Sequence, residues 1–246
     1  MTWSYSRLTT FENCPYSWLL KYIYHIKSGT KFFSEYGTFC HELLAGYFSG
    51  KITEETIYRR YLTGYRKNVK TPAPNEKIAN SYFQSGRDYF RQFSPPQGRT
   101  VLETEEKSEF IVAGYPFIGF IDLVTEDDRG KLYITDHKSH NLKPRSIRKH
   151  PTQSDRELDN YLRQLYLYSI PVHNRYGRCP DFLEFNCFRT GVWITEPFSE
   201  ARLDEVIRWA KERIETITKT NKWNPCVDDW FCRYLCDSEE YCEVRH

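Results

Sequence analysis

Two aspartates, Asp122 and Asp136, flank a segment that is typical of the turn of a β-hairpin. The turn residues are those at 127–130 (DDRG), and the flanks at 117–124 and 131–135 are rich in β-forming residues. Folding the two strands back on each other puts the carboxylates nearly opposite one another, with Cβ atoms roughly 4.5 to 5.5 Å apart. Such a pair repels unless a cation lies between the two groups.

Lys138 adds a positive charge beside this pair. Side chains alternate along a strand, so Asp136 and Lys138 share one face while His137 points to the other. Hard carboxylate ligands next to a lysine suit Mg²⁺ or Mn²⁺. The tripeptide at 136–138 (DHK) is also common in solvated hairpins, so the metal-site interpretation depends on the rest of the chain.

A basic segment leaves directly from the second strand of the predicted hairpin. Residues 137–154 contain no Asp or Glu. Besides Lys138, the segment carries the cations Lys143, Arg145, Arg148 and Lys149. It could hold the phosphates of a nucleic acid, and a plain surface loop is the alternative.

The cysteines favour a second metal centre. Eight cysteines in a chain without a secretory signal indicate metal ligation or buried thiols rather than structural disulfides. Cys232, Cys236 and Cys242 lie within the last 15 residues, with three and then five residues between them. This density predicts a metal, while the role of Cys226 stays open.

The first part of the chain is predicted to be helical. Apolar residues recur at helical spacing in the segments 4–14, 15–23, 36–48, 53–67 and 76–93. Breaker-rich runs at 71–74 and 94–98 separate the last of these segments from their neighbours. His41 lies on the third helix, where a lone histidine is usually a packed or surface residue.

Strands and helices then alternate in the second part of the chain. Strands are predicted at about 100–112, 116–125, 131–137, 181–188 and 192–195. A helix over 155–169 carries Gln164 and Tyr168, which share a face because they are four residues apart. A long amphipathic helix begins after a cap at Ser199.

This order predicts an α/β protein with a mixed central β-sheet flanked by helices. An N-terminal helical lobe would precede the sheet, and a cysteine-rich tail would follow the last helix. We expect one domain made of four parts: 1–35, 36–98 with His41, 99–198, and 199–246.

Length and composition are those of an ordinary globular protein. The chain has 246 residues, of which 39% are hydrophobic and 28% charged. The formal net charge of +2 neither demands nor excludes a nucleic-acid partner. No apolar run approaches the roughly 20 residues that span a bilayer, and the polar start lacks a signal-peptide core. We therefore expect a cytosolic protein without a membrane partner.

Together the motifs resemble the RecB-like branch of the PD-(D/E)XK nuclease superfamily. The similarity is greatest to its iron–sulfur exonucleases, which include CRISPR-associated proteins, the AddB nuclease domain and phage-encoded relatives. The ordered set spans nearly the whole chain: the opening with Cys14, Gly37-x3-His41, Gly119-x2-Asp122, Asp136-His137-Lys138, Gln164-Leu165-x2-Tyr168 and the terminal cysteines.

The resemblance implies a restriction-endonuclease-like core and a function. The function is that of a metal-dependent DNA exonuclease, acting on DNA ends or single strands in recombination, repair or DNA processing in a bacterium, an archaeon or a phage. A homo-oligomer or a protein partner of recombination or CRISPR type would fit this setting.

The resemblance also implies residue roles. Mg²⁺ or Mn²⁺ would be held by His41, Asp122, Asp136 and the backbone carbonyl of His137. Lys138 would be catalytic together with the two aspartates. Gln164 and Tyr168 would line the site and contact DNA. A 4Fe-4S cluster would be held by Cys14, Cys232, Cys236 and Cys242.

Two departures from the family pattern stand in this sequence. Asp136 occupies a position where many relatives have glutamate, which shortens the reach of the carboxylate by one methylene. The terminal cysteines are spaced x3 then x5, where x2 then x5 is usual.

Two other functions remain open at this point. One is a non-catalytic DNA-binding module that keeps the sheet and the basic loop. The other is a structural or interaction protein with a zinc site formed by Cys226, Cys232, Cys236 and Cys242.

Overall fold

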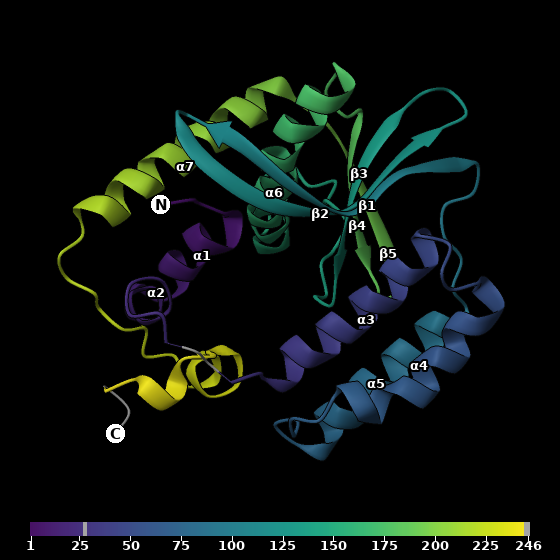
Figure 1. Ribbon diagram of the computed structural model, residues 1–246, viewed down its shortest axis with the longest axis horizontal. Helices are drawn as coiled ribbons and strands as arrows, with labels where there is room; N and C mark the ends of the chain where they lie inside the picture. The colour runs from purple at the N-terminus through teal and green to yellow at the C-terminus, as the bar shows by residue number, and fades with distance from the viewer. Residues whose placement is uncertain (27–28, 244–246) are drawn as a thin grey trace.

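The computed structural model describes residues 1–26 and 29–243, so the predicted parts 1–35 and 199–246 each include residues outside these ranges. At its centre is a sheet in the order β1-β2-β3-β4-β5 (Figure 1). The strands are β1 (Arg99–Val112), β2 (Tyr115–Asp127), β3 (Leu132–Lys138), β4 (Phe182–Cys187) and β5 (Val192–Pro197). Neighbours are antiparallel except β3 and β4, which are parallel. The predicted mixed α/β architecture is therefore confirmed.

The predicted hairpin between β2 and β3 closes through a hydrogen-bonded turn. Asp127 Oδ1 accepts hydrogen bonds from the backbone N–H groups of Arg129 and Lys131. Gly130 has a φ of 73°, a conformation that glycine adopts without a steric penalty. The turn thus sets the register that aligns the residues of the two strands.

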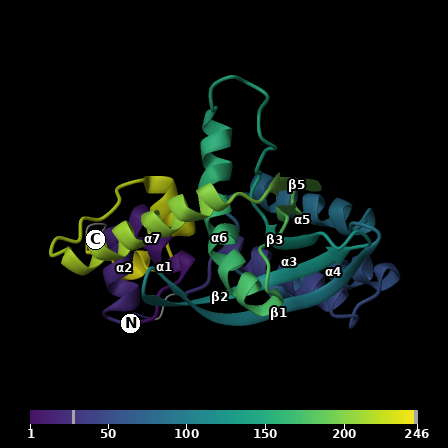
Figure 2. The same cartoon turned by 90° about the horizontal axis from the view of Figure 1, so that it is seen from above.

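Helices α6 (Gln153–Tyr176) and α7 (Glu200–Lys219) pack together on one face of the sheet (Figures 1 and 2). α1 (Tyr5–Asn13) packs against both of them, and α2 (Pro15–Tyr22) packs against α1. Their apolar faces share one hydrophobic core with the strands. α6 also provides the crossover that two adjacent parallel strands require.

The predicted helical lobe lies away from α6 and α7 (Figure 1). It consists of α3 (Phe32–Phe48), α4 (Glu54–Asn68) and α5 (Glu76–Arg91), which enclose a second hydrophobic cluster. α3 begins four residues earlier than the predicted 36–48 segment, because Phe32 is buried and extends the apolar face of the helix.

α6 is longer than the predicted 155–169 helix. Thr152 caps its start by accepting a hydrogen bond from the backbone N–H of Asp155, and Gly177 ends it in the left-handed conformation. Pro171 lies inside the helix. The last turns persist because Val172 is fully buried, so packing offsets the backbone hydrogen bond that proline removes.

The C-terminal tail returns to the first two helices. Ser199 caps α7, as predicted. Beyond this helix, Trp223 stacks on Trp18 of α2 with ring centroids 5.2 Å apart. Two short turns follow, the π-helical η1 (Phe231–Leu235) and the 3₁₀ turn η2 (Glu239–Tyr241). Within the described ranges, every helix is too short or too polar to pass through a bilayer.

Candidate active site

The hairpin brings Asp122 and Asp136 together. Leu123 pairs with Thr135 in the antiparallel register, so Asp122 and Asp136, the next residues on each strand, lie opposite one another. Both are buried, with exposed fractions of 8% and 2%. The structure thus brings together the two carboxylates singled out in the sequence, while their role as metal ligands stays a prediction.

A third carboxylate, which the sequence pattern did not single out, extends this row onto β1. Thr104 pairs with Leu123, and the residues next to them, Glu105 and Asp122, therefore lie opposite one another. Glu105 has a φ of 52°, a left-handed conformation that few residues other than glycine adopt. Three neighbouring strands thus each contribute one acid at the same level of the sheet.

His41 on α3 approaches this row from the helical lobe. Its Nδ1 lies 3.4 Å from Asp122 Oδ2. One nitrogen of His41 and one carboxylate oxygen each of Glu105 and Asp122 lie within 4.8 Å of one another. Carboxylate oxygens suit Mg²⁺ or Mn²⁺, and a transition metal such as Mn²⁺ also accepts an imidazole nitrogen. The residues therefore fit the divalent cation that the sequence predicts.

The electrostatics of the site also favour a bound cation. Burial raises the pKa of Asp122 well above its ordinary value, and the charge of Asp136 raises it further. Burial and Asp136 likewise raise the pKa of Glu105. Burial lowers the pKa of His41, so its contact with Asp122 is not an ion pair of the imidazolium. The carboxylates resist ionisation together, and a cation relieves this repulsion.

Lys138 is held beside Asp136 by a chain of polar contacts. Its Nζ lies 2.8 Å from Asp136 Oδ2 and donates a 2.9 Å hydrogen bond to Gln164 Oε1. The amide nitrogen of Gln164 in turn donates to Tyr168 OH over 3.3 Å. Gln164 and Tyr168 therefore orient the lysine, and their predicted contact with DNA stays a prediction.

Gly119 allows α6 to approach the sheet closely. A Cβ atom at this position would lie 2.4 Å from the ring of Tyr168, which is far inside van der Waals contact. The glycine of the Gly119-x2-Asp122 motif thus has a packing role, because it lets the Tyr168 ring approach β2 closely.

His137 contacts both Asp122 and the helical lobe. Its backbone N–H donates a 2.7 Å hydrogen bond to Asp122 Oδ2. The ring stacks on Phe48, approaches Asn186 and lies edge-on to the His41 ring, with centroids 5.7 Å apart. His137 is thus next to the site, and the role of its carbonyl as a metal ligand stays a prediction.

The basic loop between β3 and α6 stands out from the rest of the molecule (Figure 2). Lys143, Arg148 and Lys149 are exposed on it. Arg145 differs from them, because its guanidinium donates 2.7 Å hydrogen bonds to Asp159 and Glu196. Three of the four cations predicted to contact phosphates are therefore accessible. Arg145 instead anchors the loop to the fold through Asp159 and Glu196.

The four predicted cluster cysteines line one pocket with Cys226. They are Cys14, Cys232, Cys236 and Cys242. The sulfur of Cys14 accepts hydrogen bonds from the backbone N–H groups of Ser17 and Cys226, at 3.3 and 3.2 Å. The donor set fits an iron–sulfur cluster or a zinc ion.

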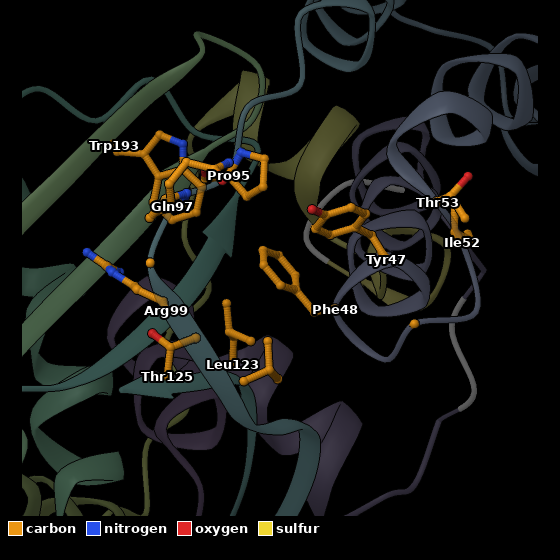
Figure 3. A pocket seen from close by; sticks show the side chains of 14 residues that line it. Tyr47, Phe48, Ile52, Thr53, Pro95, Gln97, Arg99, Leu123, Thr125 and Trp193 are labelled. Atoms are coloured by element: carbon orange, nitrogen blue, oxygen red, sulfur yellow. The ribbon is translucent and has the colours of Figure 1, made fainter. Parts of the chain in front are cut away.

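A separate pocket lies on the other face of the sheet. Figure 3 shows Trp193 and Gln97 on one side of it and Tyr47 and Phe48 on the other. The guanidinium of Arg99 in this pocket is already paired with both carboxylate oxygens of Glu184. None of the candidate catalytic side chains lines this pocket, so it is not the site of the proposed chemistry.

Two solved structures and one family model are similar to this chain. The structure is similar to that of a protein from Eubacterium rectale named "Putative exonuclease", with a TM-score of 0.51 and 12% identity over 99% of this chain and 88% of that one. The SSO0001 structure is 18% identical over 98% and 96%, with a TM-score of 0.33. No curated protein matches. The sequence model of the PD-(D/E)XK nuclease superfamily matches residues 2–243. The chain therefore belongs to the PD-(D/E)XK nuclease superfamily.

Proposed function

We propose that this nuclease is a metal-dependent DNA exonuclease that acts on DNA ends or single strands during recombination, repair or DNA processing. The observation that carries the proposal is the group formed by His41, Glu105 and Asp122, whose ligand atoms lie within 4.8 Å of one another. Asp136 and Lys138 lie beside this group. Mg²⁺ or Mn²⁺ would be held by these acids, by His41 and by the carbonyl of His137.

The residues of the chain would divide the work of phosphodiester hydrolysis. When bound, the cation supplies Lewis acidity, which neutralises phosphate charge and makes a water molecule easier to deprotonate. Lys138 would orient the attacking water or pair with the phosphate, since Gln164 and Asp136 hold its ammonium in place. His41 can act as a ligand because its lowered pKa keeps the imidazole neutral.

A structural 4Fe-4S cluster is the second part of the proposal. Cys14, Cys232, Cys236 and Cys242 would bind it, and it would join the start of the chain to its tail. The support is that these cysteines line one pocket and that Cys14 accepts two backbone N–H groups. With this brace, the four predicted parts of the chain would act as one domain.

The test uses anaerobically purified protein and end-labelled DNA. Wild type should shorten single-stranded or duplex DNA in the presence of Mg²⁺ or Mn²⁺, and this cleavage should stop when EDTA is added. Asp122→Ala, Asp136→Ala and Lys138→Ala should each abolish cleavage, because these residues supply charge to the reaction. Asp128→Ala is the control, since this exposed acid lies in the turn of the same hairpin. Wild-type turnover by any of the three variants at saturating Mn²⁺ would contradict the assignment.

A further inference from the structure

Two adjoining hollows extend from the candidate metal site to the C-terminal tail. The first, of about 560 Å³, is bordered by His41 and Glu105 and by Phe33 and Ser139. The second, of about 570 Å³, shares Phe33 and Ser139 and continues to Trp230. Because they share part of their walls, the two hollows adjoin one another, and we describe them together as one groove. We call it the tail groove.

One face of α3 forms the floor of the tail groove. Phe33, Gly37 and His41 follow at intervals of four residues, so they lie in one line along the helix. At a rise of 1.5 Å per residue, the distance along the helix from His41 to Phe33 is about 12 Å. At Gly37 the floor is open, because an added Cβ would meet only the Ser139 hydroxyl, at 3.9 Å.

Aromatic side chains line the far end of the groove. Trp230 is 48% exposed and lies against Tyr234 on η1, with ring centroids 4.6 Å apart. Phe33 packs against Tyr82 on the other side, at 5.2 Å. An exposed tryptophan beside a tyrosine, within a groove, is the kind of surface on which nucleobases stack.

The groove also carries a positive charge. Arg189 donates a hydrogen bond from Nε to the carbonyl of Ser139 and lies over the Tyr82 ring. It makes no ion pair within the part of the chain that the structure describes. Lys31, by contrast, is paired with Glu239. Arg189 is therefore the cation of the groove that is available to a phosphate.

We propose that the tail groove binds single-stranded DNA, with bases stacked on Trp230 and Tyr234 and a phosphate at Arg189. The proposal rests on the function proposed above and adds the form of the substrate and its path to the metal site. A duplex hides its base faces within the stack, so the aromatic pair can engage them only in a single strand. An open strand can lie in a groove that runs along one helix and reach His41.

The first test measures binding without turnover. In EDTA, fluorescence anisotropy compares an oligothymidylate, an abasic strand of the same length and a duplex. Wild type should bind the oligothymidylate about fivefold or more tighter than the abasic strand, because base stacking on an aromatic side chain is worth at least this factor. Equal affinity for these two strands, or tighter binding of the duplex, would overturn the proposal.

Variants then locate the contacts. Trp230→Ala should remove the preference for the oligothymidylate over the abasic strand, and Trp230→Phe should restore much of it. Arg189→Gln should lower the affinity for the oligothymidylate and for the abasic strand by the same factor. Tyr241→Ala is the control, since Tyr241 is 46% exposed on the same tail but does not line the groove. A Trp230→Ala protein that melts like wild type and keeps the preference overturns the proposal.

A separate measurement distinguishes this proposal from the proposed function. Wild type is assayed with Mn²⁺ and bis(p-nitrophenyl) phosphate, a small diester that has no nucleobase to stack. Hydrolysis of the diester without a base preference in binding overturns the groove and supports the metal site. A base preference without hydrolysis supports the groove and contradicts the nuclease chemistry.

Discussion

The backbone N–H of His137 donates a hydrogen bond to Asp122 Oδ2 across the β2–β3 hairpin, at 2.7 Å. The same oxygen lies 3.4 Å from Nδ1 of His41. The bond therefore holds the Asp122 carboxylate in a fixed orientation between the sheet and the helical lobe. Since the charged form of Asp122 accepts this N–H, the bond partly offsets the effect of burial on its pKa.

Glu105→Gln should lower the affinity for Mn²⁺. The substitution keeps the shape of the side chain and removes a charge from the group formed with His41 and Asp122. Calorimetric titration of Mn²⁺ measures the effect. Glu106→Gln is the matched control, because Glu106 is the exposed neighbour of Glu105 on β1 and is not part of this group. If both variants bind Mn²⁺ like wild type, Glu105 is not a ligand.

His41→Ala should weaken Mn²⁺ binding more than it weakens DNA binding. His41 is a ligand supplied by a separate element, α3, so its loss opens the coordination sphere without removing a charge that faces DNA. Titration of Mn²⁺ is compared with DNA anisotropy for the same variant. An unchanged dissociation constant for Mn²⁺ would mean that His41 is only a packed residue.

The basic loop should bind phosphates without reading bases. Neutralising Lys143, Arg148 and Lys149 together should lower the affinity for every DNA sequence. It should also flatten the log-log salt dependence, by up to about 0.7 per lost contact on single strands. Arg145→Gln should instead lower the melting temperature, since it breaks ion pairs with Asp159 and Glu196. A triple variant with the salt slope of wild type rules the loop out.

Much of the fold could be predicted from the sequence because local patterns determine it. Alternating strands, the polar turn at 127–130 and the cap at Ser199 each act within a few residues. Glu105 could not be found in this way. The segment around it holds several glutamates, and a register shift between Val101 and Glu103 decides which of them faces Asp122. That shift is a property of strand pairing, which no local pattern gives.

The structural role of Arg145 could not be predicted from the sequence for a similar reason. In the sequence it is one of several cations in an acid-free segment, and its partners Asp159 and Glu196 lie on α6 and β5. Only the fold brings them together. Gly119 is likewise recognisable in the sequence only as part of a motif. The reason that a glycine is needed there is the Tyr168 ring of α6, which leaves no room for a Cβ atom.

Asp155 should make the stability of the protein depend on acid pH. Hydrogen bonds from Ser146 and then Thr152 hold its pKa below the ordinary 3.8. The carboxylate therefore contributes stability that is fully present above pH 3.8 and is lost as the pH falls through the lower folded pKa. Melting temperatures of wild type and Asp155→Asn should differ most at neutral pH and converge in acid. A difference in melting temperature that does not change with pH would contradict the assignment of this stability to the Asp155 carboxylate.

Cys14→Ala should give colourless or unstable protein, because Cys14 would be the one cluster ligand from the far end of the chain. Holding residues 14 and 232 together would remove loop-closure entropy worth about 5 kcal/mol from the unfolded chain, by analogy with a disulfide. This is a large share of the roughly 5 to 15 kcal/mol by which domains are stable. The cluster should therefore act mainly as a brace.

Cys226→Ala is the matched comparison for Cys14→Ala. The backbone N–H of Cys226 donates to the Cys14 sulfur, and an alanine keeps that N–H. This variant should therefore stay brown and melt near the wild-type temperature. Absorption spectra, iron and zinc analysis and melting curves of anaerobic protein measure both variants. If Cys226 were essential and Cys14 dispensable, with zinc in place of iron, the local four-cysteine zinc site would be correct and the brace would be wrong.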